Sequence, residues 1–75
     1  MATDVDQKLQ QRLAQRCRQL RAERGLSQMD MVRQFEFSLS HYQKIERGVL
    51  DCRLTTLDRL ADCFELTLSD LLEGV

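Results

Sequence analysis

The chain carries few side chains from which an enzyme or a metal site could be built. It has a single histidine, His41, and three cysteines, Cys17, Cys52 and Cys63, without the paired spacing of a zinc site or a disulfide framework. It has no glycine-rich phosphate loop and no carboxylate pair suited to catalysis. We therefore expect no enzymatic activity, no metal and no cofactor. Cys17 and Cys63 are expected in the core, whereas Cys52, in an expected loop, is either a buried or a redox-sensitive thiol.

The basic residues are concentrated in the middle of the chain. Taken for the chain as a whole, the net charge of −1 argues against nucleic-acid binding, because phosphate binding needs clustered lysines and arginines. However, all eleven basic residues lie between Lys8 and Arg59, together with only six of the twelve acidic residues. This asymmetry could place a basic face against DNA and an acidic face away from it, the alternative being an ordinary mixed surface.

Length and composition predict one all-α domain over residues 1–75. The chain contains 43% hydrophobic residues and no proline, which favours compact helices over strands separated by turns. No stretch approaches the roughly 18 apolar residues of a membrane span. Residues 1–8 are polar and unlike a signal peptide, so we expect a cytoplasmic protein.

The first predicted helix covers about five turns and stops at Gly25. Thr3 with Asp6 resembles a capping box at its start. Its apolar residues recur at spacings of four and three, which places them on one face: Val5, Leu9, Leu13, Cys17 and Leu20.

Two short helices joined by a tight turn are predicted over residues 27–48. Ser27 is a natural N-cap with Asp30 at the third helical position, and a two-turn helix follows. Ser38 caps the next helix, which ends at Gly48.

Two further helices are predicted after a loop over residues 49–53. Leucines recur at spacings of three and four up to Phe64, and Thr67 with Asp70 caps a last short helix. Each helix is too short to persist alone. A shared core must hold the five together, built from the leucines with Phe35, Phe37, Tyr42, Ile45 and Phe64.

Three separated motifs resemble the Xre family of helix-turn-helix regulators, to which phage repressors and Cro proteins belong. They are LRAERGLSQ at residues 20–28, YQKIERG at 42–48 and LTTLDRLA at 54–61, and the match covers about residues 13–72 without gaps. The resemblance implies a compact five-helix, phage-repressor-like DNA-binding domain. Its helix-turn-helix would consist of the second and third helices, and the helix after Ser38 would be the recognition helix.

The resemblance implies that five residues of the recognition helix face the major groove of DNA: Ser38, Leu39, Ser40, Gln43 and Lys44. Ser40 and Gln43 can donate to or accept from base edges, and Lys44 can reach O6 and N7 of guanine. Leu39 could only pack on a thymine methyl, and its alternative is an exposed or partner-covering leucine.

The resemblance also implies contacts with the DNA backbone. Gln28, at the start of the second helix, corresponds to a residue that binds a phosphate through its side-chain amide and backbone N–H. His41, Arg47 and Arg53 are the other expected backbone contacts, and solvated arginines without a ligand are the alternative for the last two.

The arginines of the first helix have two expected roles. The resemblance implies that Arg21 forms a structural ion pair with Glu46, joining the first and third helices. The remaining arginines of this helix, with one from the second, are expected to be plain surface charge: Arg12, Arg16, Arg18 and Arg33.

Two positions depart from the family pattern. Glycine is usual in the turn before the recognition helix and after the fourth helix, whereas this chain has Glu36 and Glu65 there. A non-glycine residue in a left-handed conformation is strained by about 1 kcal/mol. Glu36 also adds negative charge beside the expected DNA face.

Two functions follow from these patterns. The leading one is a stand-alone transcriptional regulator, a dimeric repressor or controller protein that binds a palindromic operator, because one module makes few phosphate contacts. The alternative is a protein-interaction module such as an antitoxin or antirepressor with weak or no DNA binding, in which Leu39, Val49 and Leu50 lie in an interface. The homodimer surface is expected in the carboxy-terminal half, at Leu50, Leu54, Leu57, Leu68, Leu71 and Leu72.

Overall fold

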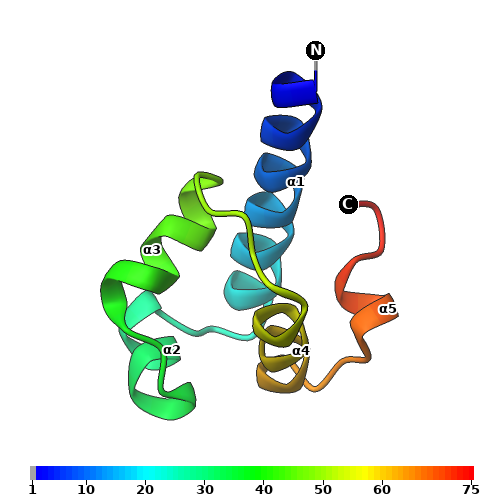
Figure 1. Ribbon diagram of the computed structural model, residues 1–75. Coiled ribbons are helices and arrows are strands. Elements are labelled where there is room, and N and C mark those ends of the chain that lie inside the picture. The colour runs from blue at the N-terminus through cyan, green and yellow to red at the C-terminus, as the bar shows by residue number, and fades with distance from the viewer. Residues whose placement is uncertain (1) are drawn as a thin grey trace.

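A computed structural model describes the backbone of residues 2–75 and the side chains of residues 8–75 (Figure 1). Within residues 2–75 all regular structure is helical, which confirms the predicted all-α fold and its five helices. The elements are α1 (Ala2–Glu23), α2 (Gln28–Phe35), α3 (Leu39–Arg47), α4 (Leu54–Cys63) and α5 (Leu68–Leu71).

The first helix is longer than the sequence led us to expect. It has 22 residues and begins at Ala2, so Thr3 lies inside the helix and the predicted N-cap at that residue is wrong. The side chains of Thr3, Val5 and Asp6 lie outside the described residues. The helix ends where predicted, with Gly25 at a φ of 67° in the turn that follows.

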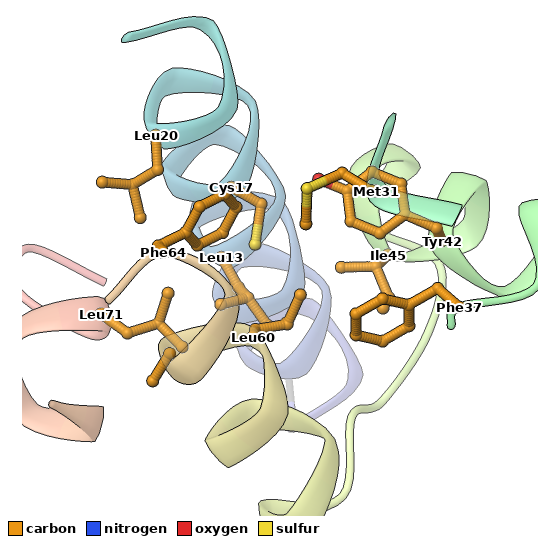
Figure 2. Packing of buried hydrophobic residues seen from close by; sticks show 11 residues of the cluster. Leu13, Cys17, Leu20, Met31, Phe37, Tyr42, Ile45, Leu60, Phe64 and Leu71 are labelled. Carbon is orange, nitrogen blue, oxygen red and sulfur yellow. The ribbon is translucent and has the colours of Figure 1, made fainter. Parts of the chain in front are cut away.

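Every helix contributes to one hydrophobic core (Figure 2). Burial of these side chains is the main force that holds such short helices together. The core consists of Leu13, Cys17, Leu20, Met31, Phe37, Tyr42, Ile45, Leu60, Ala61, Phe64 and Leu71. The aromatic core residues are as predicted, except that Phe35 is half-buried at the margin.

Two leucines lie differently from the prediction. Leu9 shares the apolar stripe of α1 but is 47% exposed, because the core begins one turn later at Leu13. Leu71 is completely buried, so it cannot take part in a dimer surface. Its side chain points into the core beside Leu60 (Figure 2).

Polar caps define where the shorter helices begin. The Ser27 hydroxyl accepts the Asp30 N–H at 3.0 Å and the Asp30 carboxylate accepts the Ser27 N–H at 2.8 Å, so the predicted capping box is confirmed. Thr67 likewise accepts the Asp70 N–H at 3.1 Å. These bonds satisfy amides that a helix leaves unpaired at its first turn.

Gly48 ends α3 for two reasons. Its φ of 73° lies in the left-handed region, and a Cβ built there would come within 3.1 Å of the Gln11 backbone. The glycine therefore both ends the helix and lets α1 and α3 approach closely.

Two arginines of α1 bind backbone carbonyls and are not the plain surface charges we expected. Arg16 donates from Nε to the Leu71 carbonyl at 3.1 Å and from Nη2 to that of Asp70 at 2.8 Å. Arg18 donates to the carbonyl of Glu46 near the end of α3. Carbonyls at helix ends lack partners within the helix, so both side chains tie α1 to its neighbours. Arg12 and Arg33 are exposed.

Glu36 and Glu65 both adopt the left-handed conformation, so these two turns tolerate a glutamate and keep a geometry that suits glycine. Their φ angles are 61° and 57°. Each therefore carries the strain of a Cβ in a region that glycine enters freely.

Replacing Glu65 with glycine is expected to stabilise the protein. The strain removed exceeds the entropy that glycine adds to the unfolded chain, so Glu65→Gly should raise the free energy of unfolding by about 0.5 kcal/mol in chemical denaturation. The control is Gln19→Gly, an exposed residue inside α1, which should lower the free energy of unfolding by about 1 kcal/mol. A Glu65→Gly protein clearly less stable than wild type would show that this backbone is unstrained, because only the entropy cost of glycine would then remain.

Candidate nucleic-acid interface

Helix α3 has one buried face and one exposed face. Tyr42, Ile45 and Glu46 are buried against α1 and the core. The opposite residues recur at the three- and four-residue spacing of a helix face and are exposed. They are Ser40, Gln43, Lys44 and Arg47, with Leu39 beside them at 38% exposure.

At the start of α3, the hydroxyl of Ser38 is engaged in a hydrogen bond within the protein. The Ser38 hydroxyl accepts the His41 N–H at 3.1 Å, so Ser38 is the N-cap that the sequence predicted. His41 is half-buried, and its ring lies against Phe37 with centroids 6.1 Å apart. His41 therefore lies on the flank of α3 and not on its exposed face.

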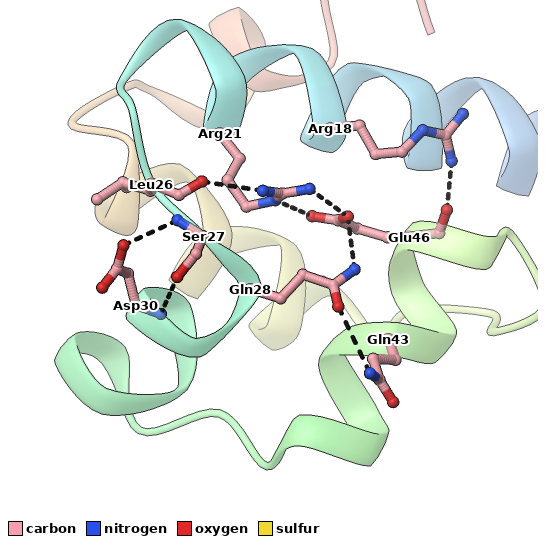
Figure 3. A network of polar contacts seen from close by, with 8 residues as sticks. All are labelled: Arg18, Arg21, Leu26, Ser27, Gln28, Asp30, Gln43 and Glu46. Atoms are coloured by element: carbon pink, nitrogen blue, oxygen red, sulfur yellow. Dashed lines mark hydrogen bonds and ion pairs between the residues drawn. The ribbon is translucent and has the colours of Figure 1, made fainter.

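A partly buried ion pair fixes α3 to α1 (Figure 3). Arg21 Nε lies 2.7 Å from Glu46 Oε2 and Nη2 lies 3.0 Å from Oε1, so the expected pair is present and bidentate. Arg21 Nη1 also donates to the Leu26 carbonyl at 2.9 Å. Glu46 is only 4% exposed, and the fork of the guanidinium matches its two oxygens.

Gln28 belongs to the same network and is not a free amide at the start of α2. Its Nε2 donates to Glu46 Oε1 at 3.0 Å, and its Oε1 accepts a long hydrogen bond of 3.5 Å from Gln43. A buried carboxylate needs several donors, and Gln28 supplies one that Arg21 does not. A continuous path of polar contacts thus joins Arg21, Glu46, Gln28 and Gln43 (Figure 3). The path begins where α1 packs on α3 and ends on the exposed face of α3.

Opposing effects set the pKa of Glu46. Burial alone would raise it, but hydrogen bonds from Arg21 and Gln28 together with the charge of Arg21 hold the pKa below its ordinary value of 4.5. The Tyr42 hydroxyl approaches the carboxylate closely enough to influence it, although its geometry completes no hydrogen bond. Glu46 is therefore ionised in the folded protein, as the ion pair requires.

Three cationic side chains remain available for anions. Among the described residues, none forms a hydrogen bond or ion pair with the side chains of Lys44, Arg47 or Arg53. Arg53 occupies the N-cap position of α4 without making a side-chain cap bond. The structure thus keeps these cations exposed near the recognition helix and the loop that follows it.

The cysteines do not form a site. In the part of the chain that the structure describes, no three histidine, cysteine or acidic side chains come together as metal ligands. Burial raises the pKa of Cys17 to about 12 and that of Cys63 to about 11, and it also raises the pKa of Cys52. A raised pKa disfavours the reactive thiolate, so the redox-sensitive alternative for Cys52 has no support in its surroundings.

The sequence did not single out Arg18 or the contact between Gln28 and Gln43. Arg18 and Arg21 are three residues apart on one face of α1, and both reach Glu46, one at its carbonyl and the other at its carboxylate. That spacing is the signal that could have identified Arg18. The glutamine contact depends on the angle between α2 and α3, which no sequence spacing encodes.

The ionised Glu46 makes stability dependent on pH. Because its folded pKa is lowered, its contribution is present above pH 4.5 and is lost as the pH falls through the lowered folded value. Glu46→Gln should cost about 2 kcal/mol at neutral pH, since it removes the counter-charge of the partly exposed Arg21 guanidinium. Denaturation curves should show that the difference in free energy of unfolding between wild type and Glu46→Gln becomes smaller as the pH falls. The exposed control Glu23→Gln should change the free energy of unfolding little at any pH. A difference that stays constant at low pH would contradict the role of the ion pair.

Comparison with known proteins agrees with this arrangement. A family model described as a helix-turn-helix domain matches residues 12–73. The HTH-type transcriptional regulator DdrOP3 of Deinococcus deserti is 41% identical over 64 residues, which cover 85% of this chain and 50% of that protein. The chain thus spans about half the length of this curated relative. The chain belongs to the helix-turn-helix domain family, in agreement with the Xre-like motifs of its sequence.

Proposed function

We propose that this protein is a sequence-specific DNA-binding transcriptional regulator that inserts α3 into the major groove. The observation that carries the proposal is the division of α3 into two faces. One face is fixed to α1 through Glu46, while the other presents hydrogen-bonding and cationic side chains to solvent. A rigid scaffold with an exposed polar helix is what base recognition requires.

The proposed contacts divide by chemistry. Base edges are contacted by Ser38, Leu39, Ser40, Gln43 and Lys44, and the sugar-phosphate backbone by Gln28, His41, Arg47 and Arg53. Since the Gln28 side chain already binds Glu46, a phosphate at this helix end would be held first by backbone N–H groups. The amide of Gln28 would then orient Gln43 toward the bases.

The proposal includes a homodimer on a palindromic operator and a cytoplasmic location. Two apolar side chains at either end of the loop between α3 and α4 are strongly exposed, Val49 at 63% and Leu54 at 74%. Beside them lies an apolar groove of about 260 Å³, lined by Leu9, Leu13, Leu50, Leu57, Leu72 and Val75. An exposed apolar surface of this kind could pack on its own copy across a two-fold axis. Repressor or controller action is also part of the proposal.

A second candidate is a protein-interaction module with weak or no DNA binding. The observation in its favour is the exposure of Leu39 and Val49 on or next to the proposed DNA face. Apolar residues at such positions fit a protein partner better than phosphates.

Binding to DNA separates the two candidates. The affinity for random duplex DNA should fall steeply as the salt concentration rises, because cationic contacts release counterions. Ser40→Ala and Lys44→Ala should each reduce the preference for a selected operator over random DNA by about tenfold, whereas Arg53→Ala, which removes a proposed phosphate contact, should weaken binding to both alike. Fluorescence anisotropy on both duplexes measures this.

The control for these variants is Arg12→Ala. Arg12 lies one turn from Arg16, on the side of α1 that contacts α5, so its loss should leave both affinities nearly unchanged. Equal losses for all variants on both duplexes would reject the assigned contacts. Absence of any salt-dependent binding would reject the regulator and favour the second candidate.

A further inference from the structure

Arg59 of α4 binds the turn between the two helices of the helix-turn-helix. Its Nη2 donates to the Phe35 carbonyl at 3.0 Å and approaches that of Glu36 at 3.4 Å. These are the last residue of α2 and the left-handed residue that follows it. The guanidinium therefore supplies a donor where the end of α2 leaves carbonyls unpaired.

The same guanidinium packs on the residue that leads into α3. Its Cζ lies 4.5 Å from the centroid of the Phe37 ring, within the range of a cation–π contact. Phe37 is 3% exposed and immediately precedes Ser38, the N-cap of α3. Arg59 thus contacts three consecutive residues, Phe35, Glu36 and Phe37, that set the path of the chain into the recognition helix.

The other left-handed glutamate has a matching arginine. Arg24 Nη2 donates to the Phe64 carbonyl at 2.7 Å, and its Cζ lies 5.4 Å from the Phe64 ring. Glu65, with a φ of 57°, follows directly. Both turns with a glutamate in place of glycine therefore carry an arginine on the carbonyl just before the glutamate and on a neighbouring phenylalanine.

We propose that Arg59 is a positioning residue for the recognition helix, holding the Glu36 turn in its left-handed conformation from α4. Glycine would adopt this conformation unaided, whereas glutamate is strained there and needs an external contact to select it. The hydrogen bonds are charge-assisted and the stacked ring is buried, so the contact is directional. Because the proposal rests on DNA binding through α3, its test includes a readout independent of DNA.

The first readout is amide hydrogen exchange in the first turn of α3. The His41 and Tyr42 amides donate to Ser38, so their exchange reports how firmly this turn is held. In Arg59→Ala these amides should exchange about tenfold faster, the loss expected for hydrogen bonds to a charged group. In Arg24→Ala, the matched control, faster exchange should instead occur at Leu66, whose amide donates to the Ala61 carbonyl.

The second readout is DNA affinity, measured by fluorescence anisotropy on random and selected duplexes well below the melting temperature. Arg59→Ala should bind about tenfold more weakly, and Arg24→Ala should bind as wild type. The slope of affinity against salt should stay unchanged in Arg59→Ala, because the residue acts through the turn and not on a phosphate. Arg59→Lys keeps the charge but not the planar guanidinium, so its amide protection and its DNA affinity should lie between those of Arg59→Ala and wild type.

Glu36→Gly makes the test specific to the turn. With glycine at position 36, the left-handed conformation no longer needs Arg59. Adding Arg59→Ala to Glu36→Gly should therefore change amide exchange and DNA affinity much less than Arg59→Ala does in wild type. The positioning role would be overturned if Arg59→Ala had the same effect with glycine at position 36 as in wild type. It would also be overturned if Arg59→Lys behaved as wild type, or if Arg59→Ala reduced the slope of affinity against salt. If wild type does not bind DNA, the proposed function fails, while hydrogen exchange still decides whether Arg59 holds the turn.

Discussion

The structure depends most on the carboxylate of Glu46. It lies on the buried face of the recognition helix, where a charge without partners would be very unfavourable. Arg21 and Gln28 supply donors from α1 and α2, so satisfying this one group fixes three helices relative to one another. Arg18 adds a bond to the Glu46 carbonyl from the same face of α1. The exposed face of α3 is consequently presented by a rigid support.

The turns of this chain show a second constraint, the replacement of glycine by glutamate at two helix ends. Each glutamate brings strain and a negative charge to its turn. In both places an arginine from another helix binds the preceding carbonyl and packs on a phenylalanine. Local strain is thus offset by tertiary contacts, which makes the turn before α3 depend on α4 more than a glycine turn would.

Much of the fold could be predicted from the sequence because the signals are local. Ser27, Ser38 and Gly48 act within one helical turn of the ends that they define, and the apolar spacing of the helices identifies most of the core. The start of α1 could not be placed, since Thr3 is compatible with the helix interior as well as with a cap. Leu9 and Leu71 were misassigned because periodicity gives the face of a residue but not where along the helix the core begins and ends.

The site could be predicted only in part. The pairing of Arg21 with Glu46 and the set of exposed residues on α3 both followed from family resemblance. The engagement of Gln28 and the roles of Arg16 and Arg59 depend on contacts between residues distant in sequence, for which no spacing rule exists. Charge pattern alone could not separate these arginines from surface charge.

The central claim is that DNA binds along the exposed face of α3. It is tested most directly by titrating the isotopically labelled protein with a selected duplex and following its amide resonances by NMR. The account predicts that the largest shifts occur at Ser40, Gln43 and Lys44 and at the start of α2, with small shifts in α5. Shifts confined to the apolar groove around Leu50 and Leu72, or none at all, would contradict it.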